Sequence, residues 1–413
     1  MDMRQEKGLE IAKNGKILKT PKGFVVPSQS GNGAYLVHNV NMKTVCDCPD
    51  CELRGVKCKH QYAVEYFLEQ ITDTEGNTTT TKAVKVTYPQ NWTAYTASQT
   101  SEVTMFDQLL SDLVESVEEP TQLMGRPRLS LKESVFCSIQ KVYSQLSSRR
   151  AQSLYRNAKE RGQIGKAPNY NSINLLLGRE DITPILYRLL TISAMPLRSV
   201  ETTFIPDSSG FRTSQFGQYA IEKYGLMKKH KWIKAHILVG AKTNVIVTAR
   251  IGEENSADCP QFAPMVMEAH DNGFTVREIP ADMGYLSREN YNVATRIGAT
   301  AYIPFKDKTT DKSLGSMTWK KMYHYFQLNR EEFLEHYHQR SNVESVFNMV
   351  KMKFGDRLKS KKWIAQQNEL LCKLVAHNIV VIIHEMHELG IKPDFCSKSI
   401  SVAKNVGGDS GLN

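Results

Sequence analysis

Three carboxylates carry the strongest chemical signal in this sequence. Asp207 and Asp282 each follow an apolar run, in Phe-Ile-Pro-Asp-Ser-Ser-Gly and Ala-Asp-Met-Gly-Tyr, and Glu344 lies in a segment with helical periodicity. Phosphodiester chemistry with two metal ions needs carboxylates that hold two divalent cations about 3.5–4 Å apart. Mg²⁺ prefers oxygen ligands and keeps several waters, so two or three carboxylates suffice. The three acids therefore predict a Mg²⁺ or Mn²⁺ site, provided that the fold brings them together.

Glu344 is one of four regularly spaced residues, together with Tyr337, Arg340 and Lys351. On a helix that turns about 100° per residue, the four fall within a stripe of roughly 60°. Such a face suits a metal ion and a DNA phosphate together, because Arg can fork onto a phosphate and Lys offers a point charge. The tyrosine could stack on a displaced base or bind a phosphate.

Each of these residues also has a purely structural interpretation. Asp207 precedes Ser-Ser-Gly and Asp282 precedes Met-Gly, so either carboxylate could serve a turn. Arg340 and Glu344 could form an ordinary i,i+4 helix pair that adds a few tenths of a kcal/mol. These alternatives are reasonable singly, but together they leave the ordered set of acids unexplained.

The elements that must position these acids form a mixed α/β pattern. Strand-like runs cover residues 202–205, 232–239, 245–249, 274–279 and 301–305, and helical patterns follow over 330–354 and 369–388. Antiparallel strands followed by strands that alternate with helices indicate a mixed sheet flanked by helices. We expect the apolar stripe of the 330–354 helix to dock on this sheet, with Glu344 at the sheet edge and Arg340 and Lys351 reaching outward.

The balance of charge points to a polyanionic partner. The 413 residues include 53 Lys and Arg against 43 Asp and Glu, which gives a formal net charge of +10. Nucleic acid is the commonest such partner, although a basic protein need not bind one. A basic run extends the helix of Glu344, so we expect it to contact the DNA backbone and to lose affinity steeply with salt. Its members are Lys351, Lys353, Arg357, Lys359, Lys361 and Lys362.

The motifs resemble those of insertion-sequence transposases of the DDE class. The spacing Y-x2-R-x3-E-x6-K of their YREK-bearing branch is met in full between Tyr337 and Lys351. The segments that begin at Asp207 and Asp282 resemble the first- and second-aspartate motifs. The resemblance covers about residues 130–390. Further segments typical of the family are Lys234-Ala-His236 and Ala257-Asp258.

The resemblance implies an RNase H-like catalytic core. In such a core the three acids would bind the catalytic Mg²⁺ ions, and the Tyr, Arg and Lys of the YREK set would contact the transposon end. Two ends must be paired, so a homodimer on double-stranded DNA is expected. The short interval between Asp282 and Glu344 puts in doubt a hairpin mechanism that needs a large β insertion. Trp319, which lies in this interval, is expected in the core.

A second cluster, near the N-terminus, predicts structural zinc. Four of the eight cysteines lie between residues 46 and 58, and Cys46, Cys48, Cys58 and His60 supply a Cys₃His set suited to tetrahedral zinc. Crowded cysteines beside a histidine favour a metal over disulfides, and hence a reducing compartment. Cys51 is either a competing fifth ligand or a small buried thiol, and four-ligand coordination favours the thiol.

This cluster resembles a SWIM zinc finger, in which a strand pair carries the first two ligands and a helix start carries the last two. The resemblance covers about residues 15–70. Members of this family bind DNA or protein, and the sequence does not choose between them. A DNA-facing surface would include Lys43, Arg54, Lys57 and Lys59.

We expect five regions along the chain. A zinc finger over 1–70 is followed by a polar segment over 71–120, interpreted as a flexible linker. Residues 121–195 combine helical periodicity with basic residues and predict a helical DNA-binding region, with a merely solvated basic face as the alternative. The catalytic domain is expected over 196–390, and a disordered tail over 391–413.

The sequence as a whole indicates a DNA transposase that binds transposon ends, cleaves DNA and joins 3′-hydroxyl ends to target DNA. A transposase-derived DNA-binding protein without catalytic activity and a zinc-dependent adaptor are the alternatives. No secretory signal is visible, and the apolar run over 379–383 is too short to span a bilayer. We therefore expect a soluble cytoplasmic protein, without a membrane partner and associated with the nucleoid in a prokaryotic host.

Overall fold

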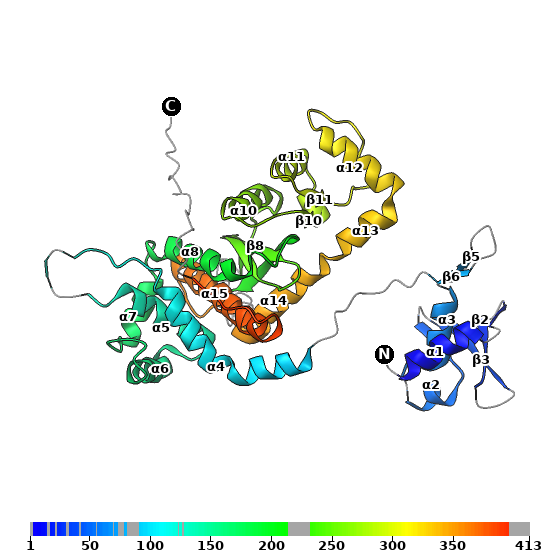
Figure 1. The fold of residues 1–413 in the computed structure, drawn as a ribbon, viewed down its shortest axis with the longest axis horizontal. Coiled ribbons are helices and arrows are strands. Elements are labelled where there is room, and N and C mark those ends of the chain that lie inside the picture. Colours follow the sequence, from blue (N-terminus) through cyan, green and yellow to red (C-terminus); the bar gives the residue numbers. More distant parts are fainter. Residues whose placement is uncertain are drawn as a thin grey trace, which may run out of the picture. The chain divides into compact units, whose positions relative to one another are not determined.

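The structure is a computed structural model, and it divides into two compact units over residues 1–90 and 91–413 (Figure 1). Each unit is described by itself. The described residues are 3–14, 17–20, 23–29, 33–40, 43–54, 56–68, 70–72, 78–80, 91–122, 124–125, 128–213 and 232–395.

The first unit is a small antiparallel sheet with helices. The strands, in sheet order, are β1 (Leu18–Thr20), β2 (Gly23–Pro27), β3 (Ala34–Val40) and β4 (Lys43–Cys46). The helices are α1 (Met3–Asn14), α2 (Pro49–Arg54) and α3 (Lys59–Leu68), and β5 (Gln70–Thr72) pairs with β6 (Thr78–Thr80). α1 packs closely on α3, since a Cβ at Gly8 would lie only 2.6 Å from the Cβ of Tyr62. The apolar core is small and is centred on Ile11, Val26, Val37, Ala63 and Val64.

The sheet of the second unit has antiparallel and parallel parts. β7 (Phe204–Arg212), β8 (Trp232–Gly240) and β9 (Ile246–Glu253) form an antiparallel meander, and β10 (Glu278–Pro280) pairs in parallel with β11 (Thr300–Tyr302). A parallel bridge between Thr203 and Glu278 places β10 beside β7. The strands therefore follow the order β9-β8-β7-β10-β11, which confirms the expected mixed sheet.

Helices lie on both faces of this sheet (Figure 1). On one side are α10 (Cys259–Asp271) and α11 (Arg288–Arg296), and on the other are α14 (Ser341–Phe354) and α15 (Trp363–Glu388). The expected apolar stripe of α14 is buried, and Phe347 meets Phe211 of β7 with ring centroids 6.5 Å apart. The stripe consists of Val343, Val346, Phe347, Val350 and Phe354.

α15 is the central helix of the second unit. Its buried Asn378 accepts a hydrogen bond from the Ile246 N–H (2.9 Å) and donates one to the Ile246 carbonyl (2.7 Å), so it satisfies the backbone where β9 begins. Among the described residues, α15 is the one helix long and apolar enough to cross a bilayer. However, 78% of its most apolar window is buried inside the protein. The expected core helix is therefore present, and it begins earlier than expected, at Trp363.

A helical region precedes the sheet. Its helices are α4 (Trp92–Val114), α5 (Leu131–Tyr143), α6 (Ser148–Glu160), α7 (Tyr170–Leu177) and α8 (Ile182–Ala194). The basic residues expected to face DNA are exposed on α6 or directly after it. They are Arg149, Arg150, Arg156, Lys159 and Arg161.

The expectation of a flexible linker over 71–120 is wrong for its second half. Asn91 caps α4 by accepting a hydrogen bond from the Ala94 N–H (3.1 Å), and Phe106, Leu110 and Leu113 are fully buried. These apolar residues recur at helical spacing, but the Ser- and Thr-rich start of the helix masks the pattern. Residues 81–90 lie outside the described residues. The expected disordered tail also begins too early, because Phe395 is only 5% exposed, and residues 396–413 are not described.

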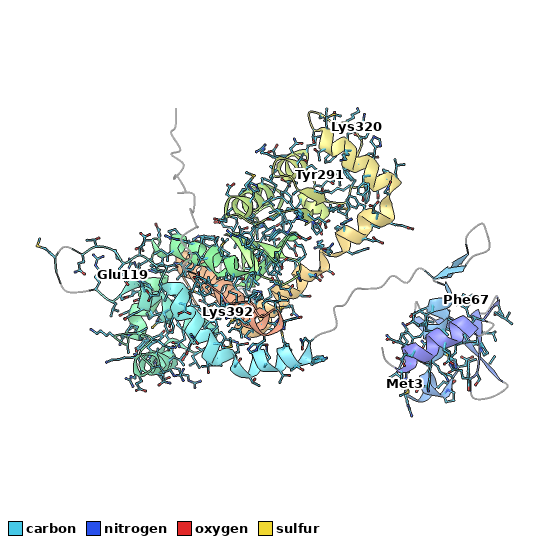
Figure 2. The ribbon with its side chains drawn as sticks, in the orientation of Figure 1. Met3, Phe67, Glu119, Tyr291, Lys320 and Lys392 are labelled. Atoms are coloured by element: carbon cyan, nitrogen blue, oxygen red, sulfur yellow. The ribbon has the colours of Figure 1, made fainter. Side chains whose placement is uncertain are left out.

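Between β11 and α14, the chain forms the helices α12 (Met317–Leu328) and α13 (Arg330–His338). Trp319 of α12 is buried against Phe305, with ring centroids 5.0 Å apart, as expected of a core residue. Figure 2 places Lys320 on the same helix, where its side chain is exposed. The described elements between β11 and α14 are therefore helices.

Candidate active site

Asp207 lies in the middle of β7, directly opposite Ile237 of β8, and does not end a strand as expected. The strand continues to Arg212 because it stays paired with β8 over its whole length. The side chain of Asp207 is 17% exposed, and its burial raises the pKa of the carboxyl group. The Ser208 N–H and Arg340 oppose that rise by stabilising the charged form.

Asp282 lies two residues beyond β10, as expected for an acid at a strand end. Its Oδ1 accepts a hydrogen bond from the Gly284 N–H (2.9 Å), so it caps the short 3₁₀ helix η2 (Met283–Tyr285). Asp282 thus serves a turn, as its structural interpretation predicts, but only one of its two carboxylate oxygens is used for this. Its Oδ2 lies 3.3 Å from a guanidinium nitrogen of Arg340.

The YREK residues do not share one continuous helix. Tyr337 belongs to α13, which ends at His338, whereas Glu344 and Lys351 belong to α14, which begins at Ser341. Arg340 occupies the turn between them, where its N–H binds the Tyr337 carbonyl (3.0 Å). The expectation of a single helix over 330–354 is therefore wrong, because the backbone tightens here into i→i−3 hydrogen bonds.

The structure brings the three acids together around Arg340. Its guanidinium nitrogens lie 4.0 Å from Asp207 Oδ1, 3.3 Å from Asp282 Oδ2 and 3.2 Å from Glu344 Oε1. The Arg340 side chain is only 20% exposed, whereas that of Glu344 is 65% exposed. Tyr337 is half-buried beside them, and its burial raises the pKa of its hydroxyl group. Carboxylates from β7, from the segment after β10 and from α14 therefore surround one point.

Lys351 points toward the sheet and does not reach outward as expected. Its Nζ donates a hydrogen bond to Ser209 Oγ (2.5 Å) and lies 5.3 Å from the centre of the Phe211 ring. Burial of this ammonium group lowers its pKa. Sequence reasoning did not single out Ser209, although period-two alternation places it on the same face of β7 as Asp207.

The opposite face of β7 and β8 carries a second polar network. Asp258, just before α10, lies 2.8 Å from Lys234 Nζ and 3.1 Å from Nδ1 of the buried His236. Burial works to raise the pKa of Asp258, but hydrogen bonds from Lys234 and Ser208 outweigh it, and the pKa is lowered. The network therefore stabilises β7 on the face opposite to Asp207. Its three members belong to the segments that the sequence marked as typical of the family.

Lys353 and Arg357 are the two further residues expected to bind DNA. The side chain of Arg357 is exposed, whereas that of Lys353 is held in an ion pair within the protein. The ammonium group of Lys353 pairs with Glu102 of α4, which also accepts a hydrogen bond from the Tyr143 hydroxyl (2.6 Å). The Glu102 side chain is only 9% exposed. Sequence reasoning missed this acid because its segment was assigned to the linker.

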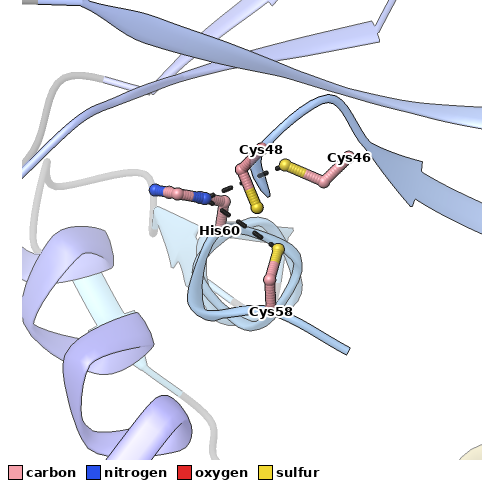
Figure 3. A group of neighbouring side chains, drawn as sticks. All are labelled: Cys46, Cys48, Cys58 and His60. Atoms are coloured by element: carbon pink, nitrogen blue, oxygen red, sulfur yellow. Dashed lines mark hydrogen bonds between the residues drawn. The ribbon is translucent and has the colours of Figure 1, made fainter. Parts of the chain in front are cut away.

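The zinc-ligand cluster of the first unit is assembled as expected. Cys46 ends β4, Cys48 follows it, and Cys58 and His60 flank the start of α3 (Figure 3). The four ligand atoms lie within 4.8 Å of one another, and all four residues are buried. His60 Nδ1 lies 3.8 Å from Cys46 Sγ and 3.9 Å from Cys58 Sγ. A tetrahedral zinc ion would set these separations at roughly 3.6 Å, so the residues fit Zn²⁺.

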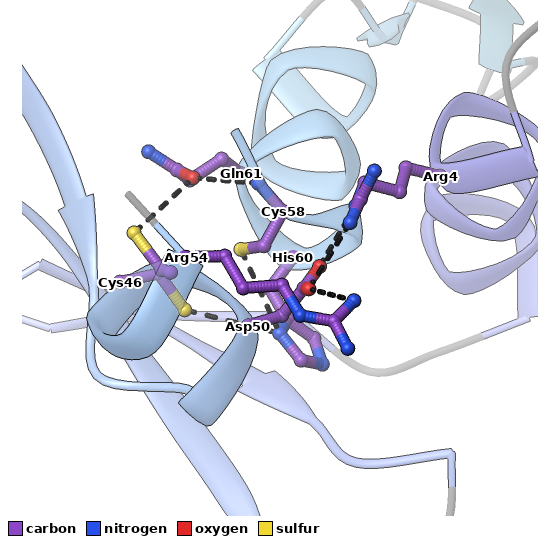
Figure 4. Close-up of polar contacts among 8 residues, drawn as sticks. Arg4, Cys46, Asp50, Arg54, Cys58, His60 and Gln61 are labelled. Carbon is purple, nitrogen blue, oxygen red and sulfur yellow. Dashed lines mark hydrogen bonds and ion pairs between the residues drawn. The ribbon is translucent and has the colours of Figure 1, made fainter. Parts of the chain in front are cut away.

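Cys51 lies outside this group of four. Its thiol donates to Oε1 of Gln61 (3.6 Å), an atom that also accepts the Cys58 N–H (2.8 Å; Figure 4). The favoured interpretation, a packed thiol, agrees with this geometry. Within the cluster, the hydrogen bond from Cys46 lowers the pKa of the Cys58 thiol to about 4, and the same bond raises the pKa of Cys46.

The basic residues of the finger have partners within it. Asp50 binds both Arg4 (2.8 Å) and Arg54 (3.4 Å), as Figure 4 shows. Lys57 pairs with Glu65 (2.6 Å), and Lys59 Nζ donates to Gln29 (3.1 Å). The Lys43 side chain lies outside the described residues. The positive charges expected to face DNA are thus largely engaged within the finger itself.

Comparison with known proteins matches both regions. The family described as "Transposase DDE domain" matches residues 198–379, and the family described as "SWIM zinc finger" matches residues 31–69. The chain is also similar to the solved piggyBac transposase synaptic complex with hairpin DNA, at 11% identity and a TM-score of 0.32. That match covers 73% of this chain and 76% of the other, and it is too distant to bear on the site. The chain therefore contains a DDE transposase domain over residues 198–379 and an N-terminal SWIM zinc finger over residues 31–69.

Proposed function

We propose that this protein is a DNA transposase that cleaves DNA at transposon ends and joins the freed 3′-hydroxyl groups to target DNA. The convergence of Asp207, Asp282 and Glu344 on one cation, Arg340, carries this proposal. Three carboxylates from separate elements are an oxygen donor set of the kind that Mg²⁺ or Mn²⁺ takes. Bound there, the two metal ions would activate the attacking oxygen and stabilise the leaving one.

The residues around the acids would hold the substrate in place. Asp207 is fixed by a fully paired strand, and the cap that Asp282 makes to Gly284 fixes the second carboxylate. Lys351, oriented by Ser209, offers a positive charge to a phosphate beside Asp207. Precise positioning of this kind supports phosphoryl transfer, which depends mainly on geometry and charge. Pairing of two ends would require a homodimer on DNA.

Metal-dependent nicking is the direct test. Purified protein should nick duplex DNA that carries the flanking sequence of its own gene, with Mg²⁺ or Mn²⁺ but not with Ca²⁺. Asp207→Asn should abolish the nicking because it removes a metal-binding carboxylate. Tight binding to those ends without nicking under any of these ions would contradict the proposal and favour a non-catalytic DNA-binding protein.

We further propose that the exposed end of the basic run contacts the DNA backbone. Arg357, Lys361 and Lys362 are exposed, whereas Lys353 is engaged by Glu102. The double variant Lys361→Gln/Lys362→Gln should therefore lower the slope of log affinity against log salt by about 2. Fluorescence anisotropy of labelled end DNA over a salt series would measure it.

The matched control removes the same charge elsewhere. Lys306 and Lys308 are exposed in the loop after β11, and Lys306→Gln/Lys308→Gln should leave the slope unchanged. An equal fall in both double variants would mean that the basic run makes no specific contact.

A further inference from the structure

Arg340 is unusually placed for a residue whose expected partner is DNA. Its guanidinium group lies inside the carboxylate cluster and contacts all three acids, and the side chain is only 20% exposed. Among the ion pairs of the described residues, each of the three carboxylates pairs with Arg340 and with no other cation. The arginine therefore occupies the position where positive charge is most needed.

The cluster would be poorly stable without such a cation. Like charges at close range disfavour ionisation, and Asp207 is nearly buried, so three carboxylates cannot stay ionised there unaided. A guanidinium group suits the task because its planar set of donors can reach several oxygens at once. Divalent ions bound by the same oxygens would supply the same neutralisation and leave the arginine redundant.

Three features suit Arg340 to leave this position. Its Nε is buried and has no hydrogen-bond partner among the described residues, so the guanidinium is held incompletely. Its backbone lies in the turn between α13 and α14 and outside both helices. Glu344, one of its three partners, is 65% exposed, so one side of the cluster opens to solvent.

We propose that Arg340 is an exchangeable internal counterion, which neutralises the three carboxylates of the free protein and competes with divalent cations for them. The inference rests on the proposed function, because it takes the three acids as the metal site. It adds that metal loading requires displacement of Arg340, so this residue sets the metal affinity of the free protein. Because Arg340 and the divalent cations compete for the same carboxylates, the guanidinium group is released only when metal ions are bound.

The test is a Mn²⁺ titration of the full chain without DNA, followed by the electron paramagnetic resonance signal of the free ion. Arg340→Gln should bind Mn²⁺ about tenfold more tightly than the wild type, because a competing charge at contact distance is gone. Arg340→Lys, which keeps the charge but cannot reach three acids at once, should tighten binding about twofold to threefold. A purely structural role for Arg340 would weaken metal binding in both variants.

The control is Arg330→Gln, which removes an equal charge from the exposed start of α13, where Arg330 stacks on Phe326. It should leave Mn²⁺ affinity within about twofold of the wild type. Other groups, such as His384, Glu385 and Glu388, could also hold a metal ion. Asp207→Asn, made alone and together with Arg340→Gln, therefore shows which part of the Mn²⁺ binding belongs to the carboxylate cluster.

The outcomes separate this inference from the proposed function. Tighter binding in Arg340→Gln that disappears with Asp207→Asn supports the counterion. Unchanged or weaker binding in Arg340→Gln, with binding still dependent on Asp207, overturns the counterion and leaves the metal site intact. Mn²⁺ binding that never depends on Asp207 overturns both. Circular dichroism confirms folding, and Arg340→Lys carries the test if Arg340→Gln does not fold.

Discussion

Glu344→Gln should reduce strand cleavage by at least about 1000-fold while DNA-end binding stays within about threefold of the wild type. The change keeps the shape of the side chain but removes the negative charge that a divalent ion needs, and a 1000-fold loss corresponds to roughly 4 kcal/mol of transition-state stabilisation. Single-turnover cleavage of end DNA and gel-shift affinity would measure the two quantities separately. Cleavage that survives in this variant would refute the role of Glu344.

The same variant decides between the chemical and the structural interpretation of this residue. Because Glu344 is 65% exposed, its i,i+4 pair with Arg340 should contribute only a few tenths of a kcal/mol to stability. Glu344→Gln should therefore unfold at nearly the wild-type temperature. Glu331→Gln, a like change at an exposed acid in the first turn of α13, should alter neither cleavage nor stability.

Cys58→Ser should abolish zinc binding and unfold the first unit. Structural zinc contributes on the order of 10 kcal/mol to small finger domains, whereas the apolar core here contains only a handful of buried residues. Elemental analysis should show the loss of one zinc per chain. Hydrogen exchange of the full chain should show lost protection in α3, with α15 unchanged, because the two helices belong to separate compact units.

Cys51→Ser is the matched control for this experiment. The thiol lies seven residues from Cys58 in the chain but bonds to Gln61 and stands outside the group of four ligands. Zinc content and protection should therefore remain as in the wild type. Loss of zinc from Cys51→Ser, or full zinc content in Cys58→Ser, would contradict the assigned ligand set.

The zinc cluster shows how far local sequence can lead. Its ligands lie within fifteen positions, from Cys46 to His60, so their spacing limits the geometries that the chain can adopt. A turn after β4 and the start of α3 then suffice to bring them together. Because structural zinc takes four ligands, the sequence also indicated that Cys51 lies outside the ligand set.

Side chains paired over long distances were beyond such reasoning. Lys353 was expected at the DNA, but its partner Glu102 lies 251 positions earlier, in a segment interpreted as a linker. Lys351 was expected to reach outward, yet Ser209, 142 positions earlier, turns it toward β7. Helical periodicity gives the face on which a residue lies, but not what other elements place against that face.

The sequence by itself determined the candidate acids Asp207, Asp282 and Glu344, the candidate zinc ligands, and the mixed strand-and-helix order of the second unit. These features can be read from the residue types and from the periodicity of apolar residues along helices and strands. Only the tertiary structure decided that α13 and α14 are separated by a turn, and that Arg340 in this turn lies among all three acids. That arrangement depends on how β7, β10 and α14 pack together, and their contacts join segments far apart in the sequence.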